Sequence, residues 1–585
     1  MNVAEFLLTI IQKLGTDTGF CLTGGMAMHI NRAAAESSLR MIYCNHEQAV
    51  TAAADGYSKA LDYKIPGLAI VTSGPGVTNT ITSVASAYYD SVPMYILAGQ
   101  VKTADINKFN VRSRGAQETP HLALMQQVTK CAFRYVPAQV NDELLIQHLS
   151  QAVAGRKGPV FVEVPLDIQA LLVEDGAARV EAVVAGIQAI VRQDLGTDGA
   201  AVASIVSALA TAQRPVLVVG NGVRISGVSR EKLKVLLEKL EIPTLFTWAS
   251  FDLLSFDHSL NFGCAGGLAP THANRVLQNA DVAVFLGTRL DLLTTAFNPQ
   301  NFGRAAKRFI VEWDQAEIDK NIGQSNTTFL RENVAGVIDG LFNQADVIPK
   351  NATWVNQCKT WREDDRVEES HAFDDKRLNT YQMARVLSAS PLSRYIVATG
   401  SGYAIEGLAR FFRPADGATF SLAGPCLGSM GLSLPTAIGA AAALGKPVVC
   451  VEGDGGLMLN VQELLTIQAN PDLPLSVIVM NNGGYQSIIQ SQKRAFGKEF
   501  GASPNSGLAA IRFDLLAQVA GLSYVLCETL EQFEAAMADE LAGPRRFIEL
   551  RVVEDGYRGP AVSTKFTSDG IPYSTDLGDI SWVRK

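Results

Sequence analysis

The sequence predicts an α/β protein made of three doubly wound parallel sheets. Three blocks of the chain each alternate short apolar strands with helical patterns, which is typical of parallel sheets that helices cover on both faces. A chain of 585 residues also exceeds what one hydrophobic core usually organises, so three domains of ordinary size are expected. We predict domains at residues 1–172, 195–345 and 375–553, followed by a C-terminal tail at 554–585.

The first block contains apolar runs that predict strands at residues 67–72, 94–98 and 160–164, with Ala-rich helices between them. A linker is expected at residues 173–197. The N-terminus carries an early acid, Glu5, and predicts an amphipathic helix rather than a signal peptide. We therefore expect a cytoplasmic protein.

The second block opens with the apolar run 214–222 and predicts further strands near Thr244, at 282–287 and at 309–314. A charged stretch at 359–376 indicates a solvated connector or an exposed helix rather than a ligand site. The third block repeats the alternation of strands and helices. The tail beyond it is expected to pack over its own or a neighbouring subunit, or to stay mobile.

The composition argues against nucleic-acid and membrane functions. Charged residues make up 18% of the chain, below the usual figure of about 25%, so more surface than usual is expected to be buried within domains or between subunits. The formal net charge of −8 gives no basic footprint for nucleic acid, and no apolar stretch is long enough for a membrane span. The eight cysteines lack paired spacing and are expected to be buried thiols.

Glycines and a carboxylate follow a buried strand of the third block, expected at residues 447–451. The strand leads to Asp454, which stands among Gly453, Gly455 and Gly456. Glycines at such a turn let a phosphate group approach the backbone closely. This run therefore predicts one half of a metal-diphosphate site.

The second half of this site follows one helix and one strand later. A helix expected at 461–470 and a strand at 475–480 bring Asn482 back to the same edge of the sheet. Hard Mg²⁺ takes oxygen ligands in octahedral geometry. We therefore predict Asp454, Asn482 and the backbone carbonyl of Gly484 as metal ligands.

The Gly453-Asp454-Gly455 run and the pair Asn481-Asn482 at this distance resemble the cofactor motif of a family of thiamine diphosphate-dependent enzymes. This is the superfamily of acetolactate synthase, pyruvate decarboxylase and benzaldehyde lyase. The resemblance covers residues 3–553 and is acetolactate synthase-like in the second block. It implies pyrimidine-binding, central Rossmann-like and diphosphate-binding domains in that order, with thiamine diphosphate and Mg²⁺ as cofactors.

Glu47 is the predicted catalytic residue of the first domain. On its own, a Glu at a helix start reflects only the helix dipole. Its neighbours Asn45-His46-Glu47-Gln48-Ala49 resemble the cofactor-activating segment of this superfamily, in which the Glu bonds the aminopyrimidine ring. A carboxyl group there favours the imino tautomer of the pyrimidine, whose nitrogen removes the C2 proton of the thiazolium ring.

The resemblance implies further cofactor-binding residues in both outer domains. Residues 424–431 resemble the loop that bends the cofactor into a V shape, with Met430 between the two rings. The carbonyl of Gly428 would accept a hydrogen bond from the pyrimidine amine. The turn 400–404 opens a helix and predicts a diphosphate cradle. The remaining predicted cofactor-binding residues are Ser73, Gly402, Tyr403, Ala404, Tyr485 and Gln486.

Four first-domain residues resemble pocket positions of the family. Gln117 is the predicted substrate-facing amide, and Gly25 and Ser73 stand in Gly-rich turns that either contact ligand or are simply tight connections. His29 differs from the apolar residue or proline of acetolactate synthases and resembles benzaldehyde lyase. It is expected to relay a proton or to be a structural histidine.

The resemblance implies decarboxylation of a 2-keto acid, with pyruvate as the expected donor, and transfer of the acyl unit to a carbonyl acceptor. Acetolactate synthases carry a Trp shortly after the Asn pair, whereas this chain has Ser491 near that position. A larger or more polar acceptor is therefore expected. Residues 481–492 look more like synthase homologues that use a nucleotide-linked keto sugar.

Two alternatives remain open at this point. A benzaldehyde-lyase-like carboligase or lyase, or a hydrolase of a cyclic diketone, would use the same Glu47 and Asp454 with a different substrate. A catalytically silent subunit that keeps only the fold is disfavoured, because the residues implied in the cofactor site are intact.

The resemblance also implies how the chain assembles and a third cofactor. A homodimer or a dimer of dimers, that is a homotetramer, is expected, with Glu47 of one chain meeting Asp454 and Met430 of another. Some relatives bind FAD in the middle domain. The runs 220–222 and 287–289 either line such a site or are ordinary strand ends.

Overall fold

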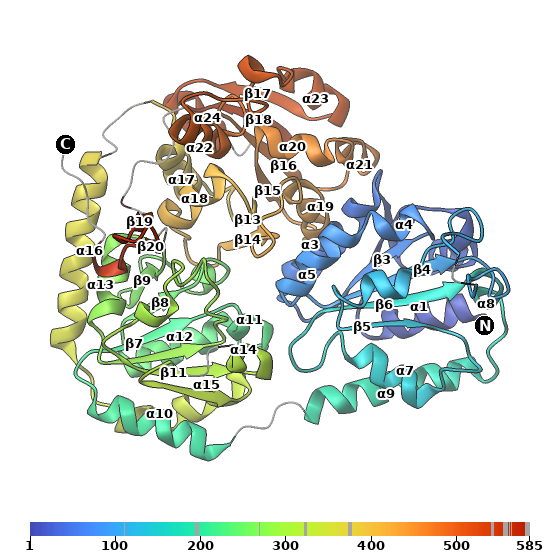
Figure 1. Cartoon of the computed structure of the whole chain (residues 1–585), viewed down its shortest axis with the longest axis horizontal. Coiled ribbons are helices and arrows are strands. Elements are labelled where there is room, and N and C mark those ends of the chain that lie inside the picture. The colour runs from blue at the N-terminus through green and yellow to red at the C-terminus, as the bar shows by residue number, and fades with distance from the viewer. Residues whose placement is uncertain are drawn as a thin grey trace.

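The protein is described here by a computed structural model. It describes residues 1–109, 111–193, 198–267, 269–320, 324–372, 377–539, 543–553, 560, 562 and 564–579. Three six-stranded parallel sheets follow one another along the chain, and helices cover both faces of each (Figure 1). The predicted fold class, three doubly wound parallel sheets, is confirmed.

The N-terminal sheet has the strand order β2-β1-β3-β4-β6-β5. Its strands β3 and β4 are buried along their whole length, because parallel strands covered on both faces read as continuous apolar runs. The strands are β1 (Thr18–Cys21), β2 (Arg40–Tyr43), β3 (Gly67–Val71), β4 (Met94–Gln100), β5 (Cys131–Arg134) and β6 (Pro159–Pro165). The helices are α1 (Val3–Lys13), α2 (Met28–Glu36), α3 (Glu47–Ala60), α4 (Pro75–Thr78), α5 (Ile81–Tyr89), α6 (His121–Met125), α7 (Asp142–Ser150), α8 (Leu166–Gln169) and α9 (Gly176–Gln193).

The central sheet has a different order, β12-β11-β10-β7-β8-β9. Its strands are β7 (Pro215–Val219), β8 (Thr244–Phe246), β9 (Asn261–Cys264), β10 (Val282–Leu286), β11 (Lys307–Glu312) and β12 (Thr327–Arg331). Its helices are α10 (Gly199–Thr211), α11 (Gly222–Ile225), α12 (Arg230–Leu240), α13 (Thr271–Asn279), α14 (Gln315–Asp319), α15 (Val334–Asn343) and α16 (Ala352–Ala372).

The C-terminal sheet has the order β14-β13-β15-β16-β18-β17. Its strands are β13 (Tyr395–Thr399), β14 (Thr419–Ala423), β15 (Val448–Gly453), β16 (Leu475–Asn481), β17 (Ser523–Cys527) and β18 (Arg546–Arg551). Its helices are α17 (Thr380–Ala389), α18 (Tyr403–Phe411), α19 (Ser433–Leu444), α20 (Asp454–Leu457), α21 (Glu463–Ala469), α22 (Gln486–Phe496), α23 (Phe513–Ala520) and α24 (Leu530–Ala538).

The linker predicted at residues 173–197 is wrong for most of its length, because α9 occupies it. Val180, Val183, Val184 and Ile187 are buried at the i, i+3, i+4, i+7 spacing of an amphipathic helix. Exposed alanines on the opposite face of the helix hid this pattern. The domain limits predicted at 195, 375 and 554 lie outside the described residues.

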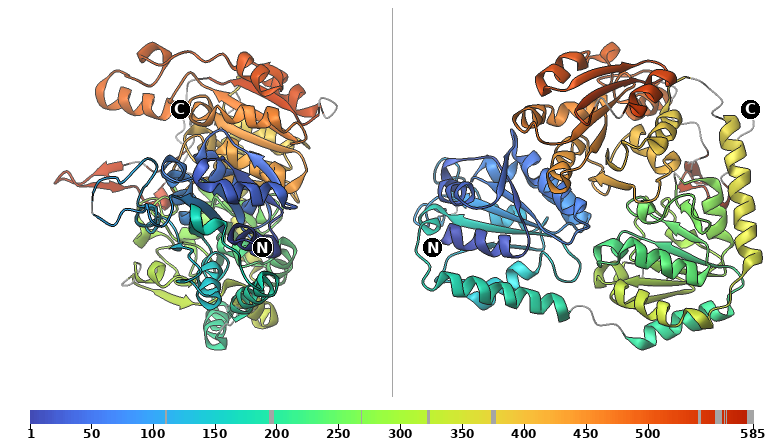
Figure 2. Two further views of the ribbon diagram at one scale, coloured as in Figure 1. Left: turned by 90° about the vertical axis from the view of Figure 1, so that its right-hand side faces the viewer. Right: turned by 180° about the vertical axis from the view of Figure 1, so that it is seen from behind.

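Residues 359–372 of the charged stretch form the second half of α16, which runs along the central domain (Figure 2), and residues 373–376 lie outside the described residues. It is less solvated than predicted. The carboxylate of Asp365 is buried against His272 (2.8 Å, Nδ1 to Oδ2), and that of Glu369 pairs with Arg413 (3.0 Å). These two acids therefore hold the helix to its neighbours.

The described part of the tail forms a hairpin of β19 (Thr564–Phe566) and β20 (Pro572–Ser574) that projects from the body of the protein (Figure 2). Beyond it, Asp576 accepts hydrogen bonds from Gln278 (3.0 Å) and Arg304 (2.8 Å) of the central domain. The tail thus packs over its own chain.

Helices α3 and α19 join the two outer domains (Figure 1). A Cβ on Gly56 of α3 would lie 1.9 Å from the backbone oxygen of Thr436, and a Cβ on Gly439 of α19 would lie 1.8 Å from that of Ala53. Each helix therefore needs a glycine where the other's backbone approaches.

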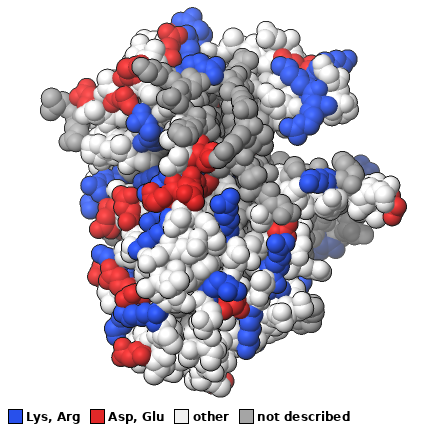
Figure 3. Space-filling view, turned by 90° about the vertical axis from the view of Figure 1, so that its left-hand side faces the viewer, with Lys and Arg blue, Asp and Glu red and all other residues white. Residues whose placement is uncertain are grey.

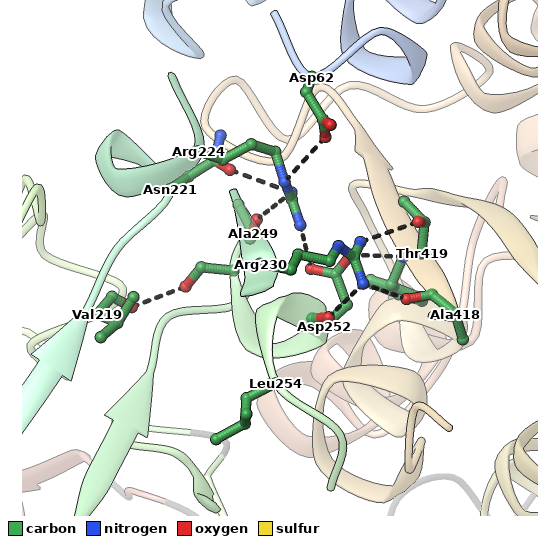
Figure 4. A network of polar contacts seen from close by, with 12 residues as sticks. Asp62, Val219, Asn221, Arg224, Arg230, Ala249, Asp252, Leu254, Ala418 and Thr419 are labelled. Carbon is green, nitrogen blue, oxygen red and sulfur yellow. Dashed lines mark hydrogen bonds and ion pairs between the residues drawn. The ribbon is translucent and has the colours of Figure 1, made fainter. Parts of the chain in front are cut away.

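A buried ion network joins the central and C-terminal domains (Figure 4). Asp252 accepts from Arg224 (2.6 Å), Arg230 (2.7 Å) and the backbone N–H of Phe420 (3.0 Å), while Arg230 also donates to Thr419 (2.9 Å). Burial alone would raise the pKa of Asp252, but the two guanidinium groups hold it below its usual value. The network fixes how these two domains sit against each other.

The surface and the thiols agree with the composition. On the face that carries α16, acidic and basic side chains stand side by side rather than in one basic patch (Figure 3). Six of the eight cysteines are buried, whereas Cys131 is half-buried and Cys426 is exposed. Among the described residues, no helix combines the length and the apolar character that crossing a membrane requires.

Candidate active site

Turns that carry most of the predicted cofactor residues lie at one edge of the C-terminal sheet. Strands β13 to β16 are parallel neighbours, so their carboxyl ends meet there. A Cβ on Gly400 would lie 2.5 Å from the carbonyl oxygen of Ala423, and a Cβ on Gly431 would lie 3.0 Å from that of Gly456. The turns after these strands therefore touch one another.

The three predicted metal ligands lie together at this edge. Asp454 accepts the N–H of Gly455 at Oδ1 (2.7 Å) and the N–H of Gly484 at Oδ2 (2.8 Å). Burial raises the pKa of Asp454 above its usual value. The Oδ1 atom of Asn482 is buried and has no hydrogen-bond partner.

This donor set fits a hard divalent cation. A cation would give the buried oxygen of Asn482 a partner and would favour the charged form of Asp454. Within the part of the chain that the structure describes, no cluster of three or more His, Cys, Asp or Glu side chains could hold a metal. A site made of one carboxylate, one amide and a backbone carbonyl is consistent with that finding.

The glycines around Asp454 serve different purposes. A Cβ on Gly455 would lie 2.1 Å from the ring of Tyr485, and one on Gly456 would lie 2.3 Å from the carboxyl group of Glu452. These two glycines are required by packing. A Cβ on Gly453 would meet no atom within 4 Å, so its backbone is open to a ligand. The predicted residue that follows Tyr485, Gln486, donates to the backbone oxygen of Asn482 at 2.7 Å.

The loop after β14 is tied to the same edge. Gly428 has a positive φ of 68° and open space at its Cβ position, and Met430 is half-buried. The next residue, Gly431, accepts a hydrogen bond from Asn460 (2.8 Å). Gly402, with φ of 80° and equally open space, directly precedes α18, whose first residues are Tyr403 and Ala404.

Glu47 is the first residue of α3. The side chain of the preceding residue, His46, caps the helix by accepting the N–H of Gln48 at Nδ1 (3.1 Å). The carboxyl Oε2 of Glu47 accepts a hydrogen bond from Asn79 (2.9 Å), which ends α4. Glu47 is thereby held against the turn that follows β3.

The four predicted substrate-side residues cluster at the carboxyl ends of β1 and β3. The glycine before Gly25, Gly24, packs on Thr72, beside Ser73, whose hydroxyl is buried without a partner. Gln117 is exposed, has φ of 63° and contacts the turn that contains Ser73. His29 is half-buried in the first turn of α2.

Hydrogen bonds of Asn45 and Gln48 join the residues around Glu47 to those at the C-terminal sheet within the chain. The N–H of Asn45 donates to Glu463 (3.1 Å), its side chain donates to Thr466 (2.9 Å), and Gln48 accepts from Asn460 (3.0 Å). Among the described residues, no hydrogen bond joins Glu47 itself to Asp454 or Met430. The structure thus brings the predicted residues of the N-terminal domain together, and likewise those of the C-terminal domain. Asn45 and Gln48, which lie on either side of Glu47 in the sequence, connect the two groups.

Sequence reasoning missed Asn79, Asn460 and Glu463. The carboxyl group of Glu463 is fully buried, and burial raises its pKa to about 7. A Glu at the start of α21 looks like an ordinary helix-dipole residue. No spacing in the sequence indicates that it contacts residues of another domain.

A separate cavity of about 1200 Å³ lies between the three domains. It is lined by residues of the central domain, including Asn221 and Arg289, by Lys59 and Tyr63 of the N-terminal domain, and by part of the loop after β14. Of the predicted catalytic, cofactor-binding and metal-binding residues, Gly428 alone lines it.

The two runs predicted to line a flavin site lie at this cavity. A Cβ on Gly220 would lie 2.1 Å from the backbone oxygen of Gly287, and one on Gly222 would lie 2.7 Å from its Cα. Packing between the two turns therefore explains these glycines without a ligand.

Models of three domains of one enzyme family match this chain in order. The N-terminal TPP binding domain of thiamine pyrophosphate enzymes matches residues 1–130, their central domain matches 202–333, and their C-terminal TPP binding domain matches 400–549. The chain belongs to the thiamine pyrophosphate enzyme family. Glu47 lies in the first matched segment and Asp454 in the third, and thiamine diphosphate, another name for the pyrophosphate, is the cofactor of this family.

Its relatives narrow the family further. A probable acetolactate synthase large subunit of Methanococcus aeolicus is 30% identical over 530 residues, which cover 86% of this chain and 85% of the relative. The acetolactate synthase isozyme 2 large subunit of Escherichia coli is 28% identical over 547 residues, covering 92% and 93%. This protein is therefore an acetolactate synthase-like, thiamine diphosphate-dependent enzyme, as the resemblance indicated.

Proposed function

We propose that this enzyme decarboxylates a 2-keto acid, pyruvate, and transfers the acyl unit to a carbonyl acceptor. The single observation that carries the proposal is the unpartnered, buried oxygen of Asn482 beside the buried Asp454. Buried polar atoms in proteins are normally hydrogen-bonded, so this pair supports a bound cation and, with it, a diphosphate. The two relatives described above are acetolactate synthase large subunits, and this chain matches them over most of their length.

In this proposal, Asp454, Asn482 and the carbonyl of Gly484 hold Mg²⁺, which anchors the diphosphate. Gly453 and the turn 402–404 give the diphosphate close access to the backbone. When bound, thiamine diphosphate supplies the electron sink for cleaving and forming carbon–carbon bonds. The other proposed cofactor contacts are Ser73, Gly428, Met430, Gly455, Gly456, Tyr485 and Gln486.

Glu47 holds the proton that the aminopyrimidine ring exchanges. Asn79 already donates to its Oε2 (2.9 Å), so Oε1 is the atom that we expect to bond the ring. A fixed carboxyl group at this place acts as a general acid or base without reorganising.

The substrate side is formed by Gln117, Gly25, Ser73 and His29. The buried hydroxyl of Ser73 lacks a partner, which supports a polar ligand there. Gln117 is exposed in the single chain, and its amide can both donate to and accept from a keto acid.

We further propose that a second copy of the chain completes each site, in a homodimer or a homotetramer. Apolar side chains beside the predicted site support this, because Met28 is 53% exposed, Tyr43 48% and Leu459 51%, and exposed apolar surface marks protein contacts. Residues 1–172, 195–345 and 375–553 remain our proposed domains.

A mixing experiment tests the shared site. Glu47→Gln and Asp454→Ala chains, each inactive alone, should regain about a quarter of wild-type activity when refolded together, because half the dimers are mixed and carry one intact site. No recovered activity in a mixture shown to contain mixed dimers would mean that both residues act within one chain.

The acceptor is proposed to be larger than a second keto acid, with a nucleotide-linked keto sugar as the first candidate. Ser491 is exposed on α22, which leaves room where the acetolactate synthases carry a Trp. A panel of carbonyl acceptors incubated with pyruvate, thiamine diphosphate and Mg²⁺ tests both substrates. Absence of carbon dioxide release with every acceptor would favour the benzaldehyde-lyase-like or cyclic-diketone reactions instead.

FAD is proposed for the cavity between the three domains, where Asn221 and Arg289 offer polar contacts. Protein purified without added flavin should then show a flavin absorption spectrum. A colourless protein that does not bind added FAD would refute this part.

A further inference from the structure

A fully buried histidine and carboxylate lie beneath the predicted substrate side. His121 begins α6, Glu163 lies in β6, and neither has any exposed surface. Nδ1 of the imidazole is 2.9 Å from Oε2 of Glu163. On the other side of the ring, the N–H of Gly74 donates to Nε2 at 3.0 Å.

These contacts determine where the proton of the ring lies. Because the N–H of Gly74 donates to Nε2, that nitrogen is unprotonated, so Nδ1 carries the proton and donates to Glu163. Arg134 donates to the other carboxyl oxygen at 2.5 Å. Burial alone would raise the pKa of Glu163, but the hydrogen bonds from His121 and Arg134 keep it below its usual value, and the carboxylate stays charged.

The carboxylate of Glu163 supports two loops of the predicted substrate side, the turn that contains Gly74 and the loop that contains Gln117. Gly74 has φ of 65°, and a Cβ there would lie 3.0 Å from the Cα of Gln117. Gln117 itself has a positive φ of 63°, which costs a non-glycine residue energy and persists only where neighbours fix it. Gln100 donates to Glu163 (2.9 Å) and to the backbone oxygen of Thr119 (3.1 Å).

We infer that His121 and Glu163 are positioning residues that hold the turn of Ser73 and Gly74 against Gln117 and thereby set the affinity for the 2-keto acid. The inference rests on the proposed function, in which Ser73 and Gln117 face the substrate. The imidazole supplies the acceptor that the turn needs, and the carboxylate holds the ring in the tautomer that can accept.

The central domain offers a matched control. His272 is also buried and also bonds a carboxylate, that of Asp365, at 2.8 Å. It lies in α13, among none of the residues predicted to bind substrate or cofactor. A His→Leu change at either position removes a buried imidazole from a carboxylate, but at His121 alone does it take an acceptor away from the predicted substrate side.

The experiment compares His121→Leu, His121→Gln and His272→Leu in the full chain with thiamine diphosphate and Mg²⁺. His121→Leu should raise the KM for pyruvate about tenfold or more while kcat changes less than about threefold, because the loops are displaced and the metal and diphosphate residues of the C-terminal domain are not. His121→Gln keeps an acceptor and a donor, and should stay within about twofold of wild type. His272→Leu should leave KM unchanged.

Hydrogen exchange gives a readout that does not depend on turnover. In His121→Leu, amides of residues 71–80 and 113–120 should exchange faster, whereas in His272→Leu they should not. Should His121→Leu fail to fold, Glu163→Gln is measured instead, with the same direction expected for KM and exchange.

An unchanged KM and unchanged exchange in the folded variant would overturn the inference. So would equal effects of His121→Leu and His272→Leu on both measurements. A wild-type enzyme that releases no carbon dioxide from pyruvate would count against the proposed function alone, because the exchange experiment still tests whether His121 holds the two loops.

Discussion

The N-terminal and C-terminal sheets share one topology, and the central sheet does not. In the N-terminal sheet the strands run β2-β1-β3-β4-β6-β5, and in the C-terminal sheet β14-β13-β15-β16-β18-β17, which is the same order counted from each sheet's first strand. The central sheet runs β12-β11-β10-β7-β8-β9. The two outer domains are thus equivalent scaffolds with a different one between them.

What distinguishes the two scaffolds is the strand end that carries a carboxylate. In the N-terminal sheet Glu47 follows the second strand, and the third strand, β3, ends at Val71 and leads to Ser73 without an acid. In the C-terminal sheet Asp454 follows the third strand, and the second strand, β14, ends at Ala423 and leads to Gly424 without one. The fold thus supplies positions, while the residue placed at each position decides the chemistry.

The largest effect is expected where the C-terminal scaffold differs, at Asp454. Asp454→Ala removes the one carboxylate of the proposed Mg²⁺ site, so kcat/KM should fall about a thousandfold or more, together with the affinity for thiamine diphosphate. Calorimetric titration with cofactor and Mg²⁺ measures the second effect. Asp472→Ala, which breaks an exposed ion pair with Arg40, is the control and should change little.

The next effect concerns the acid of the N-terminal scaffold. Glu47→Gln should lower kcat by about a hundredfold to a thousandfold, because it removes a general acid or base, while cofactor affinity stays close to that of wild type. Steady-state rates and the same titration separate the two. If the variant loses cofactor binding as Asp454→Ala does, the division of roles between the two sheets is wrong. Glu36→Gln, at an exposed pair with Arg32, is the matched control.

A third prediction concerns the contact between α3 and α19, in which each helix has a glycine where the backbone of the other approaches. In Gly439→Val the new side chain would meet the backbone oxygen of Ala53, where even a Cβ would be 1.8 Å away, and backbone cannot yield as a side chain does. We expect about 3 kcal/mol of lost stability, seen as a lower thermal midpoint. Gly199→Ala, in the first turn of α10 with open space at its Cβ position, should not lower it.

The smallest effect depends on pH and concerns the contact between Asn45 and Glu463. Burial raises the pKa of Glu463 from its ordinary 4.5 to about 7 in the folded protein. The folded state therefore favours the protonated form, and its stability falls as pH rises from about 4.5 through 7.

The Gln side chain of Glu463→Gln cannot ionise. The thermal midpoint of this variant should therefore rise relative to that of wild type as the pH increases from 5 to 8. The gain should be at most about 3 kcal/mol in stability, at 1.36 kcal/mol per pKa unit. A constant difference between variant and wild type across this range would contradict the prediction. The Glu36→Gln chain controls for the loss of a carboxylate.

Much of the fold could be predicted because buried parallel strands leave a clear signal. The strand predicted at 475–480 is β16, Leu475–Asn481, and Glu47, predicted at a helix start, is the first residue of α3. The predicted ligands Asp454 and Asn482 lie together because parallel strands end at a common edge. Their roles as ligands remain predictions.

What could not be predicted lies between elements far apart in the chain. Asn45 bonds Glu463 across a separation of 418 residues, and no local pattern encodes which domains touch. The hydrogen-bonded pair of His121 and Glu163 could not be predicted for the same reason. A single histidine and a Glu within a strand give no sequence signal that they contact each other. Helix α9 was missed because its small residues hid its apolar face.

The pairing of α3 with α19 has a consequence for how the chain is made. Gln48 and Asn460, which bond each other beside this pairing, are 412 residues apart. A ribosome needs about 20 to 80 seconds to add that many residues. During this time the face of α3 that carries small, apolar residues is without its partner helix, so a nascent N-terminal domain offers a binding surface to chaperones. A chain terminated before residue 433 lacks α19 and never covers this face.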